Sequence, residues 1–306
     1  MDIKIEKLTK TYGTQKAVND ISFEVKTGEI LGFLGPNGAG KTTTMKMITD
    51  YIAIEAGDIK IGGKSITKEG DRLRRHIGYL PEHNPLYQDM AVLDYLEFSA
   101  AIQAVPQHLI PARIREMVKV CGLNAEKHKK IGELSKGYRQ RVGLAQAMIH
   151  DPEILILDEP TTGLDPNQIV EIRKLIKEIG KEKTVILSTH ILSEVEATCD
   201  RILIINKGRI VADGTSETLR KQSQGQELVT VAIEDGKKEE VLKAINGLSS
   251  VASIEATGPN HYEVQSKPDM SIKRAVFTAC VENNWVITEM TPHVTKLEDV
   301  FRELTA

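Results

Sequence analysis

A glycine-rich segment followed by lysine and threonine has the clearest chemistry in the sequence. Its residues, GPNGAGKTT, fit the pattern GxxxxGK[ST] with Gly35, Gly40, Lys41 and Thr42 at the fixed positions. Glycines let the backbone curl so that consecutive N–H groups point at one anion. The lysine adds a positive charge beside the β- and γ-phosphates, and the threonine hydroxyl can bind Mg²⁺. Because an apolar strand (30–34) is expected before this loop and a helix after it, the sequence predicts a nucleoside triphosphate site.

Two further segments each place a reactive side chain after an apolar strand. In EILILDEP an apolar run, typical of a buried parallel strand, is followed by Asp158 and Glu159. The first carboxylate can hold Mg²⁺ and the second can polarise an attacking water. Paired acids often simply begin a helix, but Pro160 and the turn TTGLDP disfavour that here. KTVILSTH ends in His190, and although most single histidines are structural, this position at a sheet edge favours contact with the γ-phosphate.

The segment ELSKGYRQRVGLAQAM contains a second helix start that suits phosphate. Ser135 is a favourable N-cap, and apolar residues recur with helical period after it. The free N–H groups and the positive dipole end of such a helix attract anions. One chain therefore carries two phosphate-binding helix ends, far apart in the sequence.

Length and composition limit the class of protein. The chain has 306 residues, of which 41% are hydrophobic and 27% charged, and its formal net charge is −3. We find no apolar run near the roughly 18 residues of a membrane helix, and no signal-peptide core at the N-terminus. Cys121, Cys199 and Cys280 are scattered, which favours reduced core thiols. We expect a soluble, cytosolic protein without a basic nucleic-acid surface.

Together these segments resemble the nucleotide-binding subunit of ABC transporters over residues 1–222. GPNGAGKTT is similar to that family's Walker A motif, ILILDE to its Walker B motif, LSKGYRQR to its LSGGQ signature and GLDP to its D-loop. The resemblance implies an α/β fold, a P-loop NTPase cassette of the ABC type with antiparallel β and helical subdomains. The pattern turns helical over about residues 83–148, and we assign the helical arm of the cassette to this region.

The resemblance also implies ATP and Mg²⁺ as ligands. Tyr12 is similar to the aromatic that stacks on adenine, although a tyrosine packed on the sheet would fit this strand end too. The implied ATP contacts are Tyr12, Gly35, Pro36, Asn37, Gly38, Ala39, Gly40, Lys41, Thr42 and Thr43. The implied Mg²⁺ ligands are Thr42, Glu82 and Asp158, and the implied catalytic residues are Glu159 and His190.

In ABC proteins the signature of one subunit covers the γ-phosphate held by the Walker A motif of the other. Because this chain has one cassette, the resemblance implies a head-to-tail homodimer that forms with ATP and has two-fold symmetry. That arrangement explains why one chain needs two phosphate-binding helix ends. The residues implied to act in trans are Ser135, Lys136, Gly137 and Tyr138, and Asp165 stands in the D-loop.

Three positions depart from the family's motifs. Glu82 stands where the family has a glutamine that touches the Mg²⁺ shell and relays nucleotide state to the membrane partner. A carboxylate can still bind Mg²⁺ but adds negative charge beside the phosphates, so either binding needs more Mg²⁺ or the change is neutral. Lys136 and Tyr138 replace a glycine-like residue and the signature glutamine. Lys136 is either a surface charge or an added attraction for the trans γ-phosphate.

The function that the resemblance implies is an ATP-hydrolysing motor that powers export through a separate integral membrane permease subunit. The chain would then be cytoplasmic and peripheral on the inner face of the membrane. HNPLYQDMAVLDYL would form the groove for a cytoplasmic helix of the partner, unless Tyr87, Tyr95 and Phe98 simply pack the arm. The alternative is a soluble ABC ATPase that acts on nucleic acid or ribosomes. The single cassette, the lack of sustained heptads and the acidic tail disfavour it, and no nucleic-acid partner is expected.

The pattern restarts after a polar run at 221–226, which we interpret as a linker. The patterns in residues 226–306 predict strands and helices in the order βαββαβ, followed by a final helix. This order indicates a small α+β domain of the ferredoxin-like type. An inert dimerisation or stability module is favoured over ligand sensing. A similar domain ending in LEDVF recurs in exporter subunits of the multidrug and polysaccharide type. YLPEHNPLYQDM is also similar to the gliding-motility-associated ABC ATP-binding subunit.

Overall fold

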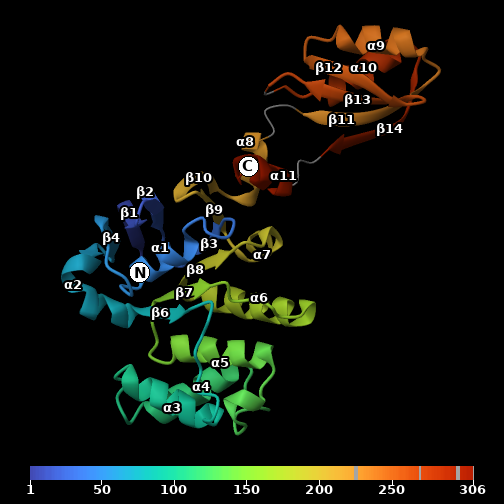
Figure 1. Ribbon diagram of the computed structural model, residues 1–306. Helices are drawn as coiled ribbons and strands as arrows, with labels where there is room; N and C mark the ends of the chain where they lie inside the picture. The colour runs from blue at the N-terminus through green and yellow to red at the C-terminus, as the bar shows by residue number, and fades with distance from the viewer. Residues whose placement is uncertain (224–226, 269, 294–296, 306) are drawn as a thin grey trace. The chain divides into compact units, whose positions relative to one another are not determined.

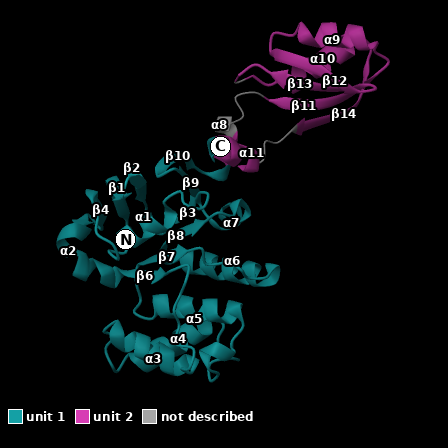
Figure 2. Ribbon diagram, in the orientation of Figure 1, with its two compact units in different colours: residues 1–216, 304–306 teal, residues 217–303 magenta. Residues whose placement is uncertain are grey.

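The computed structural model describes residues 1–223, 227–268, 270–293 and 297–305. It divides into two compact units, each described by itself below (Figure 2). The first unit comprises Met1–Ser216 and Leu304–Ala306, and the C-terminal unit comprises Glu217–Glu303. Within the described ranges, every helix is too short or too polar to cross a membrane.

An antiparallel sheet of four strands, in the order β2-β1-β4-β5, forms one layer of the first unit (Figure 1). Apolar and polar residues alternate along β1, as expected for a sheet with one buried face. The strands are β1 (Ile3–Tyr12), β2 (Gln15–Val25), β4 (Ala56–Ile61) and β5 (Lys64–Ser65).

A six-stranded sheet in the order β10-β9-β3-β8-β7-β6 forms the centre of the first unit. Its strands are β3 (Ile30–Leu34), β6 (Ile77–Leu80), β7 (Ile154–Asp158), β8 (Thr184–Thr189), β9 (Arg201–Asn206) and β10 (Arg209–Gly214). The neighbours from β6 to β9 pair in parallel, and β3, β8 and β7 are buried along their whole length. Their carboxyl ends therefore meet at one edge of the sheet, where such folds bind ligands.

Helices cover this sheet and build a separate arm. The helices beside the sheets are α1 (Lys41–Ile48), α2 (Ile66–Leu73), α6 (Pro166–Gly180) and α7 (Leu192–Thr198). The arm consists of α3 (Val92–Ile102), α4 (Ile110–Val120) and α5 (Lys136–Met148), and short 3₁₀ turns lie at Arg74–His76 and Ile131–Glu133. Residues 83–91, expected to begin the helical pattern, form turns and irregular chain, in keeping with Pro85.

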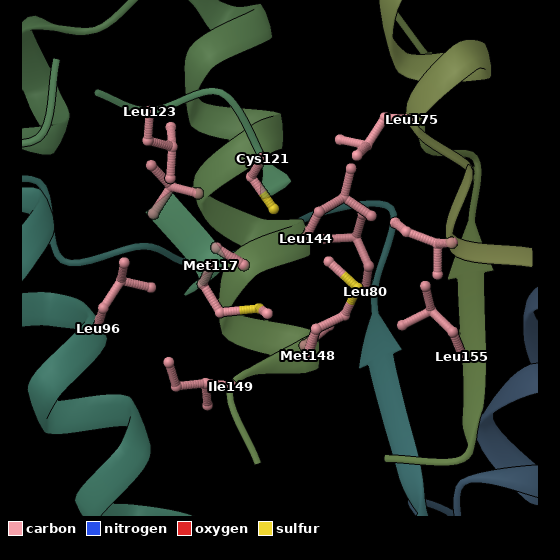
Figure 3. Close-up of a cluster of buried hydrophobic side chains, with 14 of the residues drawn as sticks. Leu80, Leu96, Met117, Cys121, Leu123, Leu144, Met148, Ile149, Leu155 and Leu175 are labelled. Carbon is pink, nitrogen blue, oxygen red and sulfur yellow. The ribbon is translucent and has the colours of Figure 1, made fainter. Parts of the chain in front are cut away.

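One hydrophobic cluster joins the arm to the sheet (Figure 3). Leu144 and Met148 of α5 lie between Leu80 of β6, Leu155 of β7 and the other arm helices. A second cluster fills the space between the antiparallel sheet, α1 and the other face of the central sheet. The signature helix α5 is therefore held by packing on the strand that ends in the paired carboxylates.

The C-terminal unit contains a four-stranded antiparallel sheet in the order β12-β13-β11-β14. Its elements are β11 (Leu228–Glu234), α9 (Lys238–Asn246), β12 (Val251–Gly258), β13 (His261–Ser266), α10 (Lys273–Glu282) and β14 (Val286–His293), together with most of α8 (Ser216–Ser223) and of α11 (Leu297–Thr305). The βαββαβ order with β11 and β13 in the centre is that of a ferredoxin-like sandwich, which confirms the predicted fold. Tyr262, Val231 and Val276 belong to its own core.

The region expected to be a linker differs from the prediction. Residues 221–223 belong to α8, and 224–226 lie outside the described residues. Leu219 of α8 is 1% exposed, so the polar run after it continues a helix that buries an apolar residue. The last described residues, 304 and 305, belong with the first unit, where Asn206 Nδ2 donates to the Leu304 carbonyl at 3.3 Å.

We expect Gly78→Ala to destabilise the first unit by about 1–3 kcal/mol, because overpacking a filled core costs that much. A Cβ at Gly78 would overlap the Ala147 carbonyl oxygen and lie 2.9 Å from Pro152 Cγ. Gly70→Ala is the matched control, since its Cβ would meet only the mobile carboxylate end of Asp50. Thermal unfolding should separate the two variants, and an unchanged melting temperature for Gly78→Ala would contradict this packing.

Candidate functional site

The loop between β3 and α1 is shaped for close approach of an anion. Gly40 has φ 110°, a conformation that side chains other than glycine rarely adopt. A Cβ at Gly40 would overlap the Ala17 carbonyl oxygen, and a Cβ at Gly35 would overlap that of Ile205. The glycines of the motif are therefore required by the packing of the loop as well as by its curvature.

Lys41 folds back over this loop. Its Nζ donates to the Gly35 carbonyl at 2.8 Å and to the Pro36 carbonyl at 3.3 Å, and the side chain is 6% exposed. The same nitrogen lies 3.5 Å from Glu159 Oε1. The ammonium group is thus fixed at the point where the loop, the first turn of α1 and the end of β7 meet.

Asp158, the last residue of β7, is buried beside Thr42. Its Oδ1 accepts hydrogen bonds from the hydroxyl groups of Ser188 and of Thr42, the latter at 3.3 Å. Its Oδ2 has no hydrogen-bond partner among the residues described. Burial raises the pKa of the Asp158 carboxyl, and the nearby Glu82 and Glu159 raise it further, against the lowering by the two hydroxyl bonds.

These oxygens fit a magnesium ion. A buried carboxylate oxygen without a partner, next to a threonine hydroxyl, offers the hard oxygen ligands that Mg²⁺ binds. No group of three acidic, histidine or cysteine side chains suited to a metal occurs in the described ranges. A metal here would accordingly take few protein ligands, as Mg²⁺ does when phosphates and waters complete its shell.

Glu159 and His190 are joined directly. His190 Nδ1 lies 2.8 Å from Glu159 Oε2, which also accepts from the Thr162 hydroxyl at 3.2 Å. Glu159 has φ 51°, an unfavourable conformation that its surroundings must hold in place. Its N–H donates to the Ser188 carbonyl at 3.0 Å. The structure thus brings the two predicted catalytic side chains together beside Lys41.

A cavity of about 460 Å³ opens at this point. Its lining residues are Gln15, Ala17, Asn37, Gly38, Gly40, Lys41, Thr42, Thr43, Glu82, Glu159, Thr162 and His190. Glu82 therefore faces the same space as the phosphate loop. Tyr12, the predicted adenine contact, ends β1 outside this lining and is 53% exposed, with the Lys10 ammonium 5.9 Å from its ring centre.

Comparison with known proteins identifies the family. The model described as ABC transporter matches residues 18–162, and a model described as an AAA domain, named for the AbiEii toxin of a type IV TA system, matches 129–196. The uncharacterized ABC transporter ATP-binding protein YxlF of Bacillus subtilis is 34% identical over 98% of each chain. The chain belongs to the ATP-binding proteins of ABC transporters. It is an ATPase of that family.

Two further relatives bear on function. The bacitracin transport ATP-binding protein BcrA of Bacillus licheniformis is 40% identical over 72% of each chain. A solved dimeric structure of the ATP-binding cassette MJ0796, in a post-hydrolysis state bound to ADP and Pi, is similar with a TM-score of 0.64. It is 25% identical and covers 70% of this chain and 98% of that one. The comparisons do not test the resemblance to the gliding-motility subunit, which stays a prediction.

In this ABC ATP-binding protein, the signature residues begin α5 on the arm. The Ser135 hydroxyl accepts from the Tyr138 N–H at 3.3 Å and caps the helix as predicted from its sequence. Gly137 is buried, and a Cβ there would lie 2.7 Å from Gln168 Cδ. Asp165 caps α6 by accepting from the Gln168 N–H at 2.9 Å. Residues 135–138 are not among those that line the 460 Å³ cavity.

The two substituted signature positions have separate surroundings. Lys136 is exposed, and its Nζ lies against Gly163 of the D-loop turn, where a Cβ would collide with it. The Tyr138 ring lies 6.0 Å from the Arg141 guanidinium. Both side chains thus contact their own chain.

The sequence analysis did not identify several residues of the site. Ser188 bonds to Asp158, Thr162 bonds to Glu159, and Gln15 lines the cavity from β2. The signal for Ser188 was its place near the end of the same apolar segment as His190. Gln15 had no comparable signal, because the antiparallel sheet brings it to the loop from a distant part of the chain.

The raised pKa of Asp158 predicts that Asp158→Asn stabilises the ligand-free ABC subunit at neutral and alkaline pH. The folded protein holds this proton more tightly than the unfolded chain, so ionised Asp158 costs stability above the raised pKa. The gain should shrink as the pH falls through the raised pKa toward the ordinary value of an aspartate, because Asp158 of the folded wild type then takes up its proton. Melting temperatures in EDTA across this range would measure it.

Asp151→Asn is the control of opposite sign. The Lys183 ammonium, 2.8 Å from the Asp151 carboxylate, lowers the pKa of that group. Asp151 therefore contributes stability above its ordinary pKa that is lost as the pH falls through the lowered value. Asp151→Asn should reduce stability at neutral pH, and its effect should also shrink in acid. Equal signs for the two variants would contradict the burial of Asp158.

Proposed function

We propose that two copies of this chain close head to tail around two ATP molecules and that ATP hydrolysis powers export through a separate membrane subunit. The observation that carries the proposal is the separation of the phosphate-binding parts within one chain. The loop, Glu159 and His190 line one cavity, and Asp158 is hydrogen-bonded to Thr42 of that lining, whereas Ser135 and Gly137 lie on the arm outside it. A second copy would supply the missing signature.

The relatives support this reading at two points. The similar MJ0796 cassette was solved as a dimer with ADP and Pi, and a two-fold arrangement gives each nucleotide one Walker A motif and one signature. BcrA is named for bacitracin transport, which favours an exporter of the resistance type. The chain would then act in the cytoplasm, on the inner face of the membrane.

The residues of the site suit phosphoryl transfer to water. Lys41 and the loop N–H groups would neutralise charge on the phosphates. Bound Mg²⁺, held by Thr42 and Asp158, would add positive charge at the phosphate oxygens. Glu159 would orient or deprotonate the attacking water, and His190 would hold that carboxylate through the 2.8 Å bond while contacting the γ-phosphate. ATP shared by two chains would close the dimer, and loss of the γ-phosphate would release it.

A second cavity of about 870 Å³ suits the membrane partner. Tyr87, Phe98 and Ile102 line it and are 54%, 38% and 66% exposed. The Tyr87 ring lies 5.5 Å from that of Phe98 and 5.9 Å from that of Tyr95. The aromatics therefore pack on one another and still present an apolar surface, which suits an amphipathic helix. Glu82 lines both cavities, and this would let the partner sense the nucleotide.

We expect Glu159→Gln to bind ATP and to lose about 10²–10⁴-fold in turnover, the usual contribution of a general base. Lys41→Ala should instead lose ATP binding, because it removes the cation fixed over the phosphate loop. Phosphate release and nucleotide binding by the purified protein would separate the two effects. Comparable ATPase rates in Glu159→Gln and wild type would rule out the catalytic role of Glu159.

Trapping with Glu159→Gln also tests the dimer and the partner. With ATP and Mg²⁺ this variant should form a dimer and co-purify with a stoichiometric integral membrane protein in mild detergent. A trapped protein that stays monomeric with its partner present would contradict the dimer. Recovery with ribosomes or DNA, and without a membrane protein, would favour the alternative function.

Phe98→Glu should abolish co-purification of the membrane subunit while ATP binding by the isolated protein is kept, because a charge would replace one of the packed aromatic rings that line the 870 Å³ cavity, the groove proposed for the partner. Val120→Glu is the matched control, since Val120 lies on the same arm with a similar exposure of 41% but does not line the groove. Equal loss of the partner in both variants would argue against this groove as the docking site.

A further inference from the structure

Glu194 is a buried carboxylate to which the mechanism above gives no role. It lies on α7 and is 1% exposed. Its Oε2 accepts from the Thr189 hydroxyl at 2.7 Å, and its Oε1 accepts from the Thr161 hydroxyl. Arg173 of α6 places a guanidinium nitrogen 3.8 Å from Oε1, the one ion pair of Glu194 in the described part of the chain. A buried carboxylate is costly unless it is bonded and paired in this way.

The two hydroxyl groups belong to the two segments that carry the catalytic pair. Thr161 follows Glu159 by two residues, and Thr189 immediately precedes His190. The Thr189 hydroxyl also accepts from the Ile191 N–H at 3.0 Å, and the Thr189 carbonyl accepts from the Gly35 N–H at 3.3 Å. One carboxylate group thus connects the turn after β7 with the end of β8.

The helix that carries Glu194 is fixed against the sheet. A Cβ at Gly32 of β3 would lie 2.7 Å from Val195 Cγ1 and 2.9 Å from Cys199 Sγ. Glycine at this position therefore allows α7 to approach the central strand more closely than another residue would permit. Because strand and helix are in direct contact, Glu194 is a fixed point to which the two catalytic segments are tied.

Glu159 and His190 need such a fixed point. Glu159 has the unfavourable φ of 51°, and the His190 side chain is 43% exposed. The bond joins the first residue after β7 to the first residue after β8, where a small shift of either segment would break it. A displacement of about 1 Å in a catalytic group can cost on the order of 10² in rate.

We propose that Glu194 is a positioning residue for ATP hydrolysis, which holds Glu159 and His190 in register through Thr161 and Thr189. The inference rests on the proposed function, because it assumes that Glu159 activates water. Glu194 touches neither the cavity nor the predicted nucleotide contacts. Its effect would therefore fall on turnover rather than on ATP binding.

The test compares steady-state ATPase kinetics of Glu194→Ala, Glu194→Gln and Thr161→Val with wild type. Glu194→Ala should lower kcat about 10- to 100-fold and change KM for ATP by less than about 3-fold, the pattern of a group that acts in the transition state. Glu194→Gln keeps one acceptor oxygen and should recover part of the loss. Thr161→Val removes one hydrogen bond to Glu194 with little change of side-chain shape. It should also lower kcat, and it tests the inference even where Glu194→Ala folds poorly.

Glu29→Gln is the matched control. Glu29 is 13% exposed and pairs with Arg201 at 3.2 Å, at the amino end of β3 and away from the cavity. It should lower the melting temperature but leave kcat within about 2-fold. In the Glu159→Gln background, Glu194→Ala should cause no further loss of turnover, because the group that it positions is already absent.

The outcomes separate the inference from the proposed function. If wild type hydrolyses ATP and Glu159→Gln does not, while Glu194→Ala and Thr161→Val keep wild-type kcat, the positioning role is wrong and the function stands. A fall in kcat of the same size in Glu29→Gln, at a comparable loss of melting temperature, would also overturn it, because the effect of Glu194→Ala would then be merely structural. Absence of turnover in wild type would overturn both.

Discussion

The burial of opposite charges at one edge of the central sheet is the constraint on which the site depends. Asp158, Glu159 and Lys41 are 0%, 6% and 6% exposed, so none can rely on water for its charge. Lys41 is held by two backbone carbonyls and Glu159, and Asp158 by two hydroxyl groups, with one carboxylate oxygen left unbonded. The pKa of the Asp158 carboxyl is raised first by its burial and then by the negative charges of Glu82 and Glu159. Two buried carboxylates thus stand beside one buried ammonium group.

The parallel strands bring these charges together, and glycine permits the required contacts. β3, β8 and β7 are neighbours in the sheet, so the phosphate loop, His190 and the paired carboxylates emerge side by side although they are far apart in the sequence. Each of these strands is buried on both faces, and this burial fixes the register in which it pairs with the next strand. Gly35 and Gly40 then let the loop touch distant backbone, where any Cβ would overlap a carbonyl oxygen.

Sequence reasoning predicted the parts of this arrangement whose chemistry is local. The phosphate loop, the acidic end of β7, the capping role of Ser135 and the ferredoxin-like order each follow from spacing and periodicity, and the fold agrees with them. The residues that sequence reasoning missed have partners that are not their neighbours in the sequence. Ser188 and Thr162 are ordinary residues in the sequence and acquire a role only when the strands align. The sequence predicts a linker at residues 221–223 because they are all polar. They continue a helix whose buried apolar residue, Leu219, lies before them in the sequence.

Glu82 adds a further negative charge to the site. It lines the nucleotide cavity and the 870 Å³ cavity, and its negative charge contributes to the raised pKa of Asp158. A glutamine at this place would contact the same atoms without that charge. With Glu82, two carboxylates and one lysine line the nucleotide cavity, and the negative charge there would favour a triphosphate that arrives with a divalent cation. Since the same side chain borders the groove proposed for the membrane subunit, a change of charge at the nucleotide would be felt there as a change in the position or pairing of Glu82. A glutamate in place of the family's glutamine therefore changes the charge of the residue that lines both cavities, while the residue at this position still borders each of them.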